Sequence, residues 1–291
     1  MSLAADILNQ EQYHRHLFSE LFDWDRFWGA TLQLVDDDAT LAANLALDQL
    51  GHFGAHGVVL AAERLRSAVK GPLARVVELG SGFGGALRHV GRELAARGVR
   101  PTLIGIEFVD RHCKLARQIG QAVGATGPSF VQADVANIPL AAASVDAVFA
   151  AGSASHFARV EAVFAECHRV LRADGALVML EEVSLRPEGA PVPGERFLHY
   201  HPPEVFHRET PARRRSQLEA AGLKIEVFED LAEWATVLLR ERVRVLQFLG
   251  QCAVRMYSRE AYERILGTLS STAEEYERKT VTPVLIVCRR S

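Results

Sequence analysis

The feature that most constrains the fold of this chain is a change of hydrophobic pattern at residue 73. From there to residue 182, short apolar runs rich in β-branched residues alternate with segments of helical periodicity. The apolar runs span 73–79, 102–107, 129–132, 145–151 and 176–182, and the helical segments span 84–97, 109–122 and 157–171. Nearly continuous apolar runs are typical of strands buried on both faces, and their alternation with helices indicates a parallel sheet covered on both sides. The sequence therefore predicts a doubly wound α/β fold.

The C-terminal part of the chain continues this pattern with additions. Residues 184–203 contain five prolines and are expected to form a loop or lid. The elements expected after it are a helix over 210–221, a strand over 223–230, a long helical stretch over 232–277 and an apolar strand over 281–287. A strand that ends the chain cannot readily form another right-handed crossover, so we expect it to insert antiparallel beside the preceding strand. The prediction is a Rossmann-like, seven-stranded, mostly parallel sheet with an antiparallel last strand and a helical cap.

The first 70 residues are predicted to be helical and to lie outside this sheet. An aromatic, amphipathic stretch over 13–28 leads into a second helix from about Thr40 to Val69, where apolar residues recur at three- and four-residue steps. We therefore divide the chain into an N-terminal helical cap or lid, residues 1–70, and a core, residues 71–291. The core carries cap insertions at about 184–209 and 232–277.

Composition and charge disfavour several classes of partner. Thirty-three basic and 36 acidic side chains leave a net charge of −3, so no overall positive field is available to hold nucleic acid or an anionic membrane. No uncharged apolar stretch approaches the roughly 18 residues of a membrane span, and no signal sequence is evident. The four cysteines lie far apart without metal-ligand spacing, as is typical of reduced thiols. We expect a cytoplasmic monomer or homodimer that binds a small molecule and no nucleic acid, membrane or metal.

A glycine-rich turn follows the first predicted strand, in Val76-Val77-Glu78-Leu79-Gly80-Ser81-Gly82-Phe83-Gly84-Gly85. Between a strand and a helix, glycines let the backbone approach a ligand, and the first N–H groups of the helix can face it. The pattern alone is ambiguous, because Gly80, Gly82 and Gly85 also satisfy the G-x-G-x-x-G of dinucleotide-binding proteins.

Three carboxylates at the ends of the first three predicted strands favour another ligand. Glu78 lies two residues before the first glycine, where it would crowd a dinucleotide pyrophosphate but suit a cationic amino-acid group. Glu107 ends the next strand and can accept both hydroxyls of a ribose, and Asp134 follows the third strand, where it can accept an adenine amino hydrogen. Helix capping is the alternative role for Asp134. Together the three suit an adenosine with a positively charged amino-acid tail.

With these residues considered together, the sequence resembles the class I S-adenosylmethionine-dependent methyltransferases of the small-molecule, natural-product type. The resemblance covers residues 73–182 through V-V-E-L-G-S-G-F-G-G, I-G-I-E, Q-A-D-V-A-N-I-P-L and C-H-R-V-L-R-A-D-G-A-L-V-M-L. It implies S-adenosyl-L-methionine as the cofactor and S-adenosyl-L-homocysteine as the product. The cofactor-binding residues that it implies are Glu78, Gly80, Ser81, Gly82, Gly84, Glu107, Phe108, Asp134, Val135, Ala151 and Gly152. Asp174 replaces the first glycine of the family's usual Gly-Gly, a turn substitution that is not expected to affect binding.

The acceptor is expected beside the loop Ala151-Gly152-Ser153-Ala154-Ser155-His156-Phe157, which borders both cofactor and acceptor in small-molecule members of that family. His156 could orient or deprotonate an acceptor, because imidazole titrates near neutral pH; a structural hydrogen bond is the alternative. Glu181 and Glu182 end the fifth strand, and Glu182 is the second catalytic candidate. The substrate candidates are Tyr13, Trp24, Trp28, Ser153, His156, Phe197 and Tyr200, whose alternative role is core packing.

Asp48, His52 and His56 are spaced four residues apart and are predicted to share one helical face. They could form half of a metal site, but we favour a polar stripe and expect no metal. The leading functional prediction is an S-adenosylmethionine-dependent methyltransferase acting on O, N or C of a small apolar or aromatic metabolite. One alternative is an NAD(P)-dependent oxidoreductase, which leaves Glu78 and Asp134 without a role. The other is a protein that binds the same cofactor but has non-methylating chemistry.

Overall fold

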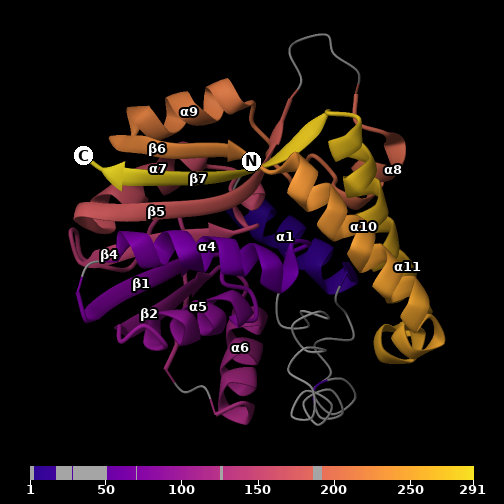
Figure 1. Ribbon diagram of the computed structural model, residues 1–291, viewed down its shortest axis with the longest axis horizontal. Coiled ribbons are helices and arrows are strands. Elements are labelled where there is room, and N and C mark those ends of the chain that lie inside the picture. Colours follow the sequence, from indigo (N-terminus) through magenta and orange to yellow (C-terminus); the bar gives the residue numbers. More distant parts are fainter. Residues whose placement is uncertain (1–2, 18–27, 29–50, 70, 125–126, 186–191) are drawn as a thin grey trace.

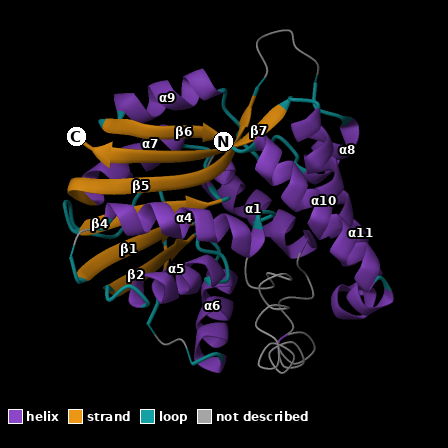
Figure 2. Ribbon diagram, in the orientation of Figure 1, coloured by secondary structure: helices purple, strands orange, loops and turns teal. Residues whose placement is uncertain are grey.

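The computed structural model describes residues 3–17, 28, 51–69, 71–124, 127–185 and 192–291. It contains a seven-stranded sheet with the strand order β3-β2-β1-β4-β5-β7-β6, drawn in Figures 1 and 2. The strands are β1 (Leu73–Leu79), β2 (Arg100–Glu107), β3 (Ser129–Gln132), β4 (Val145–Ala151), β5 (Leu171–Ser184), β6 (Leu223–Asp230) and β7 (Val281–Arg290). β7 pairs antiparallel with both β5 and β6, and the other neighbouring strands are parallel. The predicted doubly wound sheet with an antiparallel last strand is confirmed.

β5 is longer than the sequence predicts. It begins at Leu171, which already pairs with Val145, and a register shift follows before the regular pairing from Ala176 onward. Asp174 lies in this first part with a φ of 61°, in the left-handed region that aspartate tolerates better than most residues. The departure from Gly-Gly therefore lies at the amino end of β5, and the ligand site expected from the fold lies at the other end.

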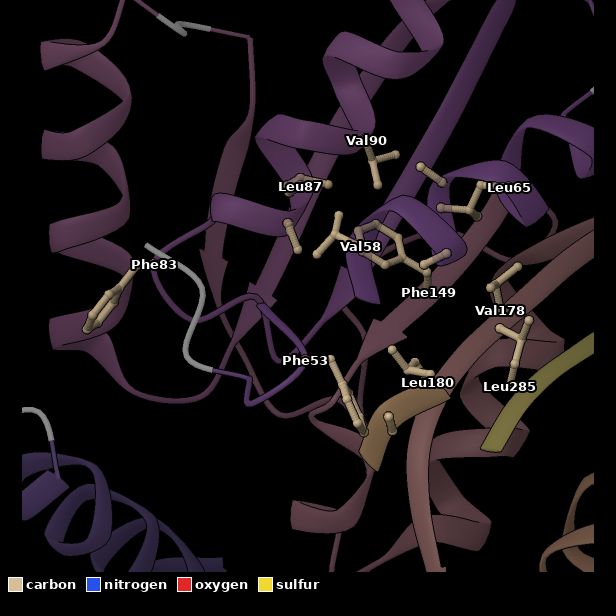
Figure 3. Packing of buried hydrophobic residues seen from close by; sticks show 14 of the residues in the cluster. Phe53, Val58, Leu65, Phe83, Leu87, Val90, Phe149, Val178, Leu180 and Leu285 are labelled. Atoms are coloured by element: carbon tan, nitrogen blue, oxygen red, sulfur yellow. The ribbon is translucent and has the colours of Figure 1, made fainter. Parts of the chain in front are cut away.

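Helices cover both faces of the sheet. One hydrophobic core lies under α4 (Gly54–Ala68), α5 (Gly85–Ala95) and α6 (Asp110–Ala122), and a second lies under α7 (Val160–Val170) and α9 (Pro211–Ala220). Figure 3 shows the first core, where labelled side chains from α4, α5, β4, β5 and β7 gather. Side chains alternate between the two faces of a strand, so Leu180 and Glu182 of β5 face the first core while Glu181 faces the second.

Among the described residues, the helix expected from about Thr40 to Val69 begins later than predicted. α4 starts at Gly54 and is preceded by a turn that contains His52. His52 is therefore not on the helix that carries the exposed His56, and the prediction that they share a helical face is wrong. Asp48 lies outside the described residues. α4 packs on β4, β5 and α5, so this part of the predicted N-terminal cap forms a layer on the sheet.

The remaining helices lie beyond the carboxyl ends of the parallel strands (Figure 1). They are α1 (Leu3–Leu17), α8 (Glu195–Tyr200), α10 (Ala232–Leu249) and α11 (Gln251–Glu277). The stretch expected to be helical over 232–277 is interrupted twice. Gly250 adopts a φ of 42° and ends α10, and Ser258 adopts a φ of 69° and kinks α11. α11 contacts α1, α8, α10 and β7, which closes one side of the space above the strand ends. In the part of the chain that is described, no helix combines the length and apolarity needed to cross a bilayer.

Candidate functional site

A cavity of about 230 Å³ lies at the carboxyl ends of β1, β2, β4 and β5. β1 lies between β2 and β4, and such a switch point is where ligands bind in open α/β sheets. We divide the cavity into two ends by the residues that line it. The nucleoside end is lined by residues 80–83 of the glycine loop (residues 80–84) with Glu107 and Asp134; the acceptor end is lined by Tyr13, His52, His156, Glu182, His201 and Phe206.

The glycine loop is held in a conformation that requires glycine. Gly80, Gly82 and Gly84 have φ values of 65°, 50° and 77°, which residues with a Cβ adopt at a cost. A Cβ on Gly80 would lie 2.6 Å from Cβ of Ser153. The backbone N–H of Gly80 donates to the Ile106 carbonyl at 2.8 Å, which pins the loop to β2. The loop therefore brings its backbone into the wall of the cavity without side chains in between.

Glu107 is a buried carboxylate at the centre of the nucleoside end. Its two oxygens accept backbone N–H groups from Gly82 at 2.8 Å and from Val109 at 2.9 Å, and His112 Nδ1 lies 3.4 Å from Oε1. Burial opposes ionisation, but the hydrogen bond and charge of His112 and the two backbone N–H groups outweigh it, so the pKa of Glu107 is lowered. Oε2 accepts one N–H and keeps a second lone pair for a hydroxyl hydrogen, whereas Oε1 already faces both Val109 and His112.

Asp134 and Glu78 complete the set of carboxylates in this part of the wall. Asp134 accepts the backbone N–H of Ala136 at 2.9 Å through one oxygen and the guanidinium of Arg159 through the other. Glu78 is 3% exposed and lies at the end of β1 beside the glycine loop. The structure thus brings together the three predicted carboxylates, and this set of acceptors fits an adenosine with a cationic tail.

The acceptor end has an aromatic wall. Tyr13 of α1 lies edge-on to Phe206 with ring centroids 5.2 Å apart, and Phe206 lies 4.4 Å from the ring of His156. The Tyr13 hydroxyl donates to the carbonyl of Tyr200 at 3.0 Å, which ties α1 to the end of α8. Burial is the main cause of the raised pKa of Tyr13, so this hydroxyl stays protonated.

Glu182 lies at the end of β5 in a dense set of hydrogen bonds. Its Oε2 accepts Nε and Nη2 of Arg208 at 2.9 and 2.7 Å. Its Oε1 accepts the hydroxyl of Tyr276 at 2.5 Å and lies 3.2 Å from Nε2 of His52. Burial opposes ionisation, but the charge of Arg208, together with the hydrogen bond from His52, outweighs it and holds the pKa of Glu182 well below its usual range. Glu182 is therefore an ionised carboxylate balanced by one guanidinium.

His156 and His201 are buried imidazoles of the acceptor end. His156 belongs to a short 3₁₀ turn (Ala154–His156) and its Nδ1 lies 3.2 Å from the carbonyl of Val205. Burial and the nearby charge of Arg208 lower the pKa of His156 to about 4. Nδ1 of His201 lies 3.1 Å from the carbonyl of Phe197, and the same two causes lower the pKa of His201 well below its usual range. Both imidazoles are neutral at neutral pH.

Most of the predicted site residues line this one cavity. They are Glu78, Gly80, Ser81, Gly82, Glu107, Phe108, Asp134, Val135, Ala151 and Gly152 from the cofactor set, and Tyr13, Ser153, His156 and Glu182 from the acceptor set. Four others do not line it. Gly84 precedes α5 behind the loop, Trp28 packs edge-on to Phe83, Phe197 is stacked under His201, and Tyr200 lies against Gly267 of α11. Trp24 lies outside the described residues.

Sequence reasoning did not assign His52, His201, Gln10 and Thr268 to the wall of the cavity. His52 had a signal, because it was predicted to lie on a polar stripe with Asp48 and His56 in the helix expected from about Thr40 to Val69, but that pattern did not identify it as a residue of the cavity wall. Gln10 of α1 and Thr268 of α11 come from opposite ends of the chain, and no local pattern links them.

Glu181 has a structural partner on the other face of β5. Arg214 of α9 donates to it through Nε at 2.8 Å and Nη2 at 3.0 Å, and both side chains are almost fully buried. This ion pair attaches α9 to the sheet. Of the two adjacent glutamates, Glu182 is the one that faces His52 and Tyr276.

Comparisons with known proteins find methyltransferases that are similar to part of this chain. Residues 77–179 match a family model described as a methyltransferase domain. The chain is 30% identical over 174 residues to dimethylglycine N-methyltransferase of Parasynechococcus marenigrum (strain WH8102), an alignment that covers 59% of this chain and 58% of that protein. The chain thus spans somewhat more than half the length of this relative.

Two solved structures have a similar fold. Phosphoethanolamine N-methyltransferase 2 of Haemonchus contortus, solved in complex with S-adenosyl-L-methionine, superposes with a TM-score of 0.69 at 14% identity, covering 80% of this chain and 52% of that one. A cyclopropane synthase of Mycobacterium tuberculosis superposes with a TM-score of 0.67 at 18% identity, covering 81% and 84%. The segment that matches the methyltransferase-domain model runs from β1 through the glycine loop, Glu107 and Asp134 into β5. Residues 77–179 therefore match a methyltransferase domain, and the sheet shares the fold of these two solved structures.

Proposed function

We propose that the chain is an S-adenosyl-L-methionine-dependent methyltransferase that acts in the cytoplasm on a small, uncharged, apolar or aromatic acceptor. The observation that carries this proposal is the continuity of the cavity. One wall runs from the glycine loop, Glu107 and Asp134 to the aromatic and hydrogen-bonding residues around Glu182. A methyl donor and an acceptor bound at its two ends would therefore meet inside a single cavity.

The nucleoside end supplies the contacts for the cofactor. Glu107 would accept the ribose hydroxyls and Asp134 the adenine amino group, while Glu78 and the backbone of the glycine loop would hold the amino-acid tail. The positive charge of that tail and of the sulfonium is matched by the carboxylates in this wall. When bound, S-adenosyl-L-methionine supplies an activated methyl group.

The acceptor end supports an uncharged acceptor. Among the described residues that line the cavity, Arg159 is the sole arginine or lysine, and it is paired with Asp134 at the nucleoside end. Arg208 is paired with Glu182 and packs 4.8 and 4.7 Å from the ring centroids of Phe197 and Phe206. A carboxylate or phosphate on the acceptor would find no available cation there, and anions buried without a partner are strongly disfavoured.

The reaction requires alignment and exclusion of water more than covalent chemistry by the protein. α1 and α11 contribute Tyr13 and Thr268 to the wall above the strand ends and shield this space. His156, neutral and hydrogen-bonded to Val205, would orient the acceptor as a hydrogen-bond partner. Glu182 would act indirectly, by positioning the side chains of Arg208, Tyr276 and His52.

Calorimetric titration tests this function. S-adenosyl-L-homocysteine should bind one site per chain, and NADH and NADPH should give no heat. Binding of a nicotinamide cofactor without binding of S-adenosyl-L-homocysteine would reject the proposal in favour of an oxidoreductase, which the methyltransferase-domain match does not favour.

A further inference from the structure

His52 occupies a position that the local sequence does not reveal. The turn before α4 lies against the end of β4: a Cβ on Gly51 would be 3.3 Å from the carbonyl oxygen of Ala151, and a Cβ on Gly152 would be 3.8 Å from Cα of Gly51. The backbone carbonyl of His52 accepts a hydrogen bond from Arg242 of α10. The imidazole therefore lines the cavity from a turn that is anchored on two sides, and it keeps 17% exposure.

The hydrogen bonds around His52 define which ring nitrogen carries the proton. Nε2 lies 3.1 Å from the hydroxyl oxygen of Tyr276 and 3.2 Å from Oε1 of Glu182. The Tyr276 hydroxyl has a single hydrogen, and it donates that hydrogen to Glu182. The ionised Glu182 has none to give. Both neighbours of Nε2 can thus only accept, so Nε2 of the neutral ring carries the hydrogen and Nδ1 carries the lone pair.

The other two histidines of the acceptor end are less suited to accept a proton. Nδ1 of His156 and Nδ1 of His201 each face a backbone carbonyl, which is uncharged, and burial together with Arg208 disfavours their protonation. His52 instead has the carboxylate of Glu182 beside Nε2, the nitrogen that carries the hydrogen of the neutral ring. A carboxylate in this position fixes the tautomer and stabilises the imidazolium that forms when the second nitrogen takes a proton. Within the described residues, no hydrogen bond occupies Nδ1 of His52.

We propose that His52, oriented by Glu182 and Tyr276, is the base that accepts the proton of a hydroxyl acceptor, so that the enzyme is an O-methyltransferase of uncharged phenols or alcohols. This proposal rests on the proposed function. The acceptor oxygen forms its bond to the methyl carbon of the sulfonium donor as the carbon–sulfur bond breaks, and that bond's electron pair stays on sulfur. The hydroxyl proton passes to Nδ1 of His52, so one positive charge disappears from sulfur and one appears on the imidazole beside Glu182.

The test uses the whole 291-residue chain and begins with a readout that needs no acceptor. In protein labelled with ¹⁵N-histidine, the His52 signals, assigned by their loss in His52→Gln, should show that the neutral ring carries its hydrogen on Nε2 and none on Nδ1. A neutral ring with its hydrogen on Nδ1 overturns the proposal. The titratable and charged groups around His52 are Glu182 of β5, Tyr276 of α11, His201 and Arg208, both C-terminal to α8, and Arg242 of α10, which donates to the His52 carbonyl.

The second readout is methylation of a panel of neutral phenols and alcohols, with glycine derivatives and simple amines as comparison compounds. His52→Gln should lower kcat at least about 100-fold, within the range that general bases supply, and the lost rate should recover as pH rises. S-adenosyl-L-homocysteine affinity should not change. The matched control is His56→Gln, which makes the same substitution at an exposed position on α4 and should leave kcat unchanged.

Three kinetic outcomes would overturn the assignment: unchanged kcat in His52→Gln, methylation of amines but of no hydroxyl compound, or no methylation of any phenol or alcohol. Each of these is distinct from failure of the proposed function, because a wild-type chain that binds no S-adenosyl-L-homocysteine would refute the methyltransferase itself.

Discussion

Replacement of Glu107 is the perturbation whose effect the structure defines best. Its two oxygens hold the backbone N–H groups of Gly82 and Val109 and, in the proposed complex, both ribose hydroxyls. Glu107→Gln keeps one acceptor oxygen and places an amide NH₂ against a backbone N–H. Glu107→Ala removes both acceptors. The two substitutions therefore form a graded series.

The expected magnitudes follow from the number of bonds lost. A hydrogen bond to a charged group contributes about 1.5–3 kcal/mol, and about 1.4 kcal/mol corresponds to tenfold in affinity. Glu107→Gln should therefore weaken S-adenosyl-L-homocysteine binding by roughly 10- to 100-fold and lower the free energy of unfolding by about 1.5–3 kcal/mol. Glu107→Ala should weaken binding by at least about 100-fold, because both ribose contacts are lost.

Isothermal titration gives the affinities and urea denaturation gives the stabilities. The control is Glu93→Gln on α5, which removes an exposed ion pair with Arg97 and should change stability by less than about 1 kcal/mol. Wild-type affinity in Glu107→Ala would refute the assignment of this carboxylate to the ribose.

Three further predictions test other parts of the structure. Gly80→Ala should abolish S-adenosyl-L-homocysteine binding in calorimetry, because the new Cβ would lie 2.6 Å from Ser153 in a residue with φ of 65°. Arg214→Ala should lower the free energy of unfolding in urea by about 3–5 kcal/mol, because it leaves the buried Glu181 without its partner; a loss below 1 kcal/mol would contradict this. Finally, His156 is neutral in the folded protein with a pKa of about 4 but binds a proton below about 6.5 when unfolded. The stability that this contributes, on the order of 3 kcal/mol, is present above pH 6.5 and is lost as pH falls toward 4. The fall, followed by urea denaturation, should be shallower in His156→Phe, and an identical pH dependence would disprove the explanation.

The sheet and the nucleoside end could be predicted because their signals are local. β1, β3, β4 and β6 have the predicted bounds. β1 and β4 lie inside the sheet and form nearly continuous apolar runs, whereas β3 and β6 are partly exposed edge strands. The glycine loop, Glu107 and Asp134 each occur at the end of such a run. Parallel strands end at the same edge of the sheet, so residues that are far apart in the chain were predictable neighbours.

The acceptor end could not be predicted in the same way. Glu182 was identified from its place at the end of β5, but its partners Arg208 and Tyr276 lie 26 and 94 residues further along the chain. His52 comes from a turn before α4 that the helical periodicity concealed. Phe197 and Tyr200 were expected to contact substrate because they are aromatic, but the packing of α8 against α11 turns them away from the cavity. Aromatic residues at helical spacing are equally suited to a core, and the tertiary arrangement of the helices decides between the two.

The most direct test of the central claim is a crystal structure of the chain with S-adenosyl-L-homocysteine. The account predicts that the ribose hydroxyls lie within hydrogen-bond distance of Glu107, the adenine lies beside Asp134, and the sulfur faces the end of the cavity lined by His52 and Glu182. A nucleoside bound among His52, His201 and Phe206, or a sulfur that points away from them, would contradict it.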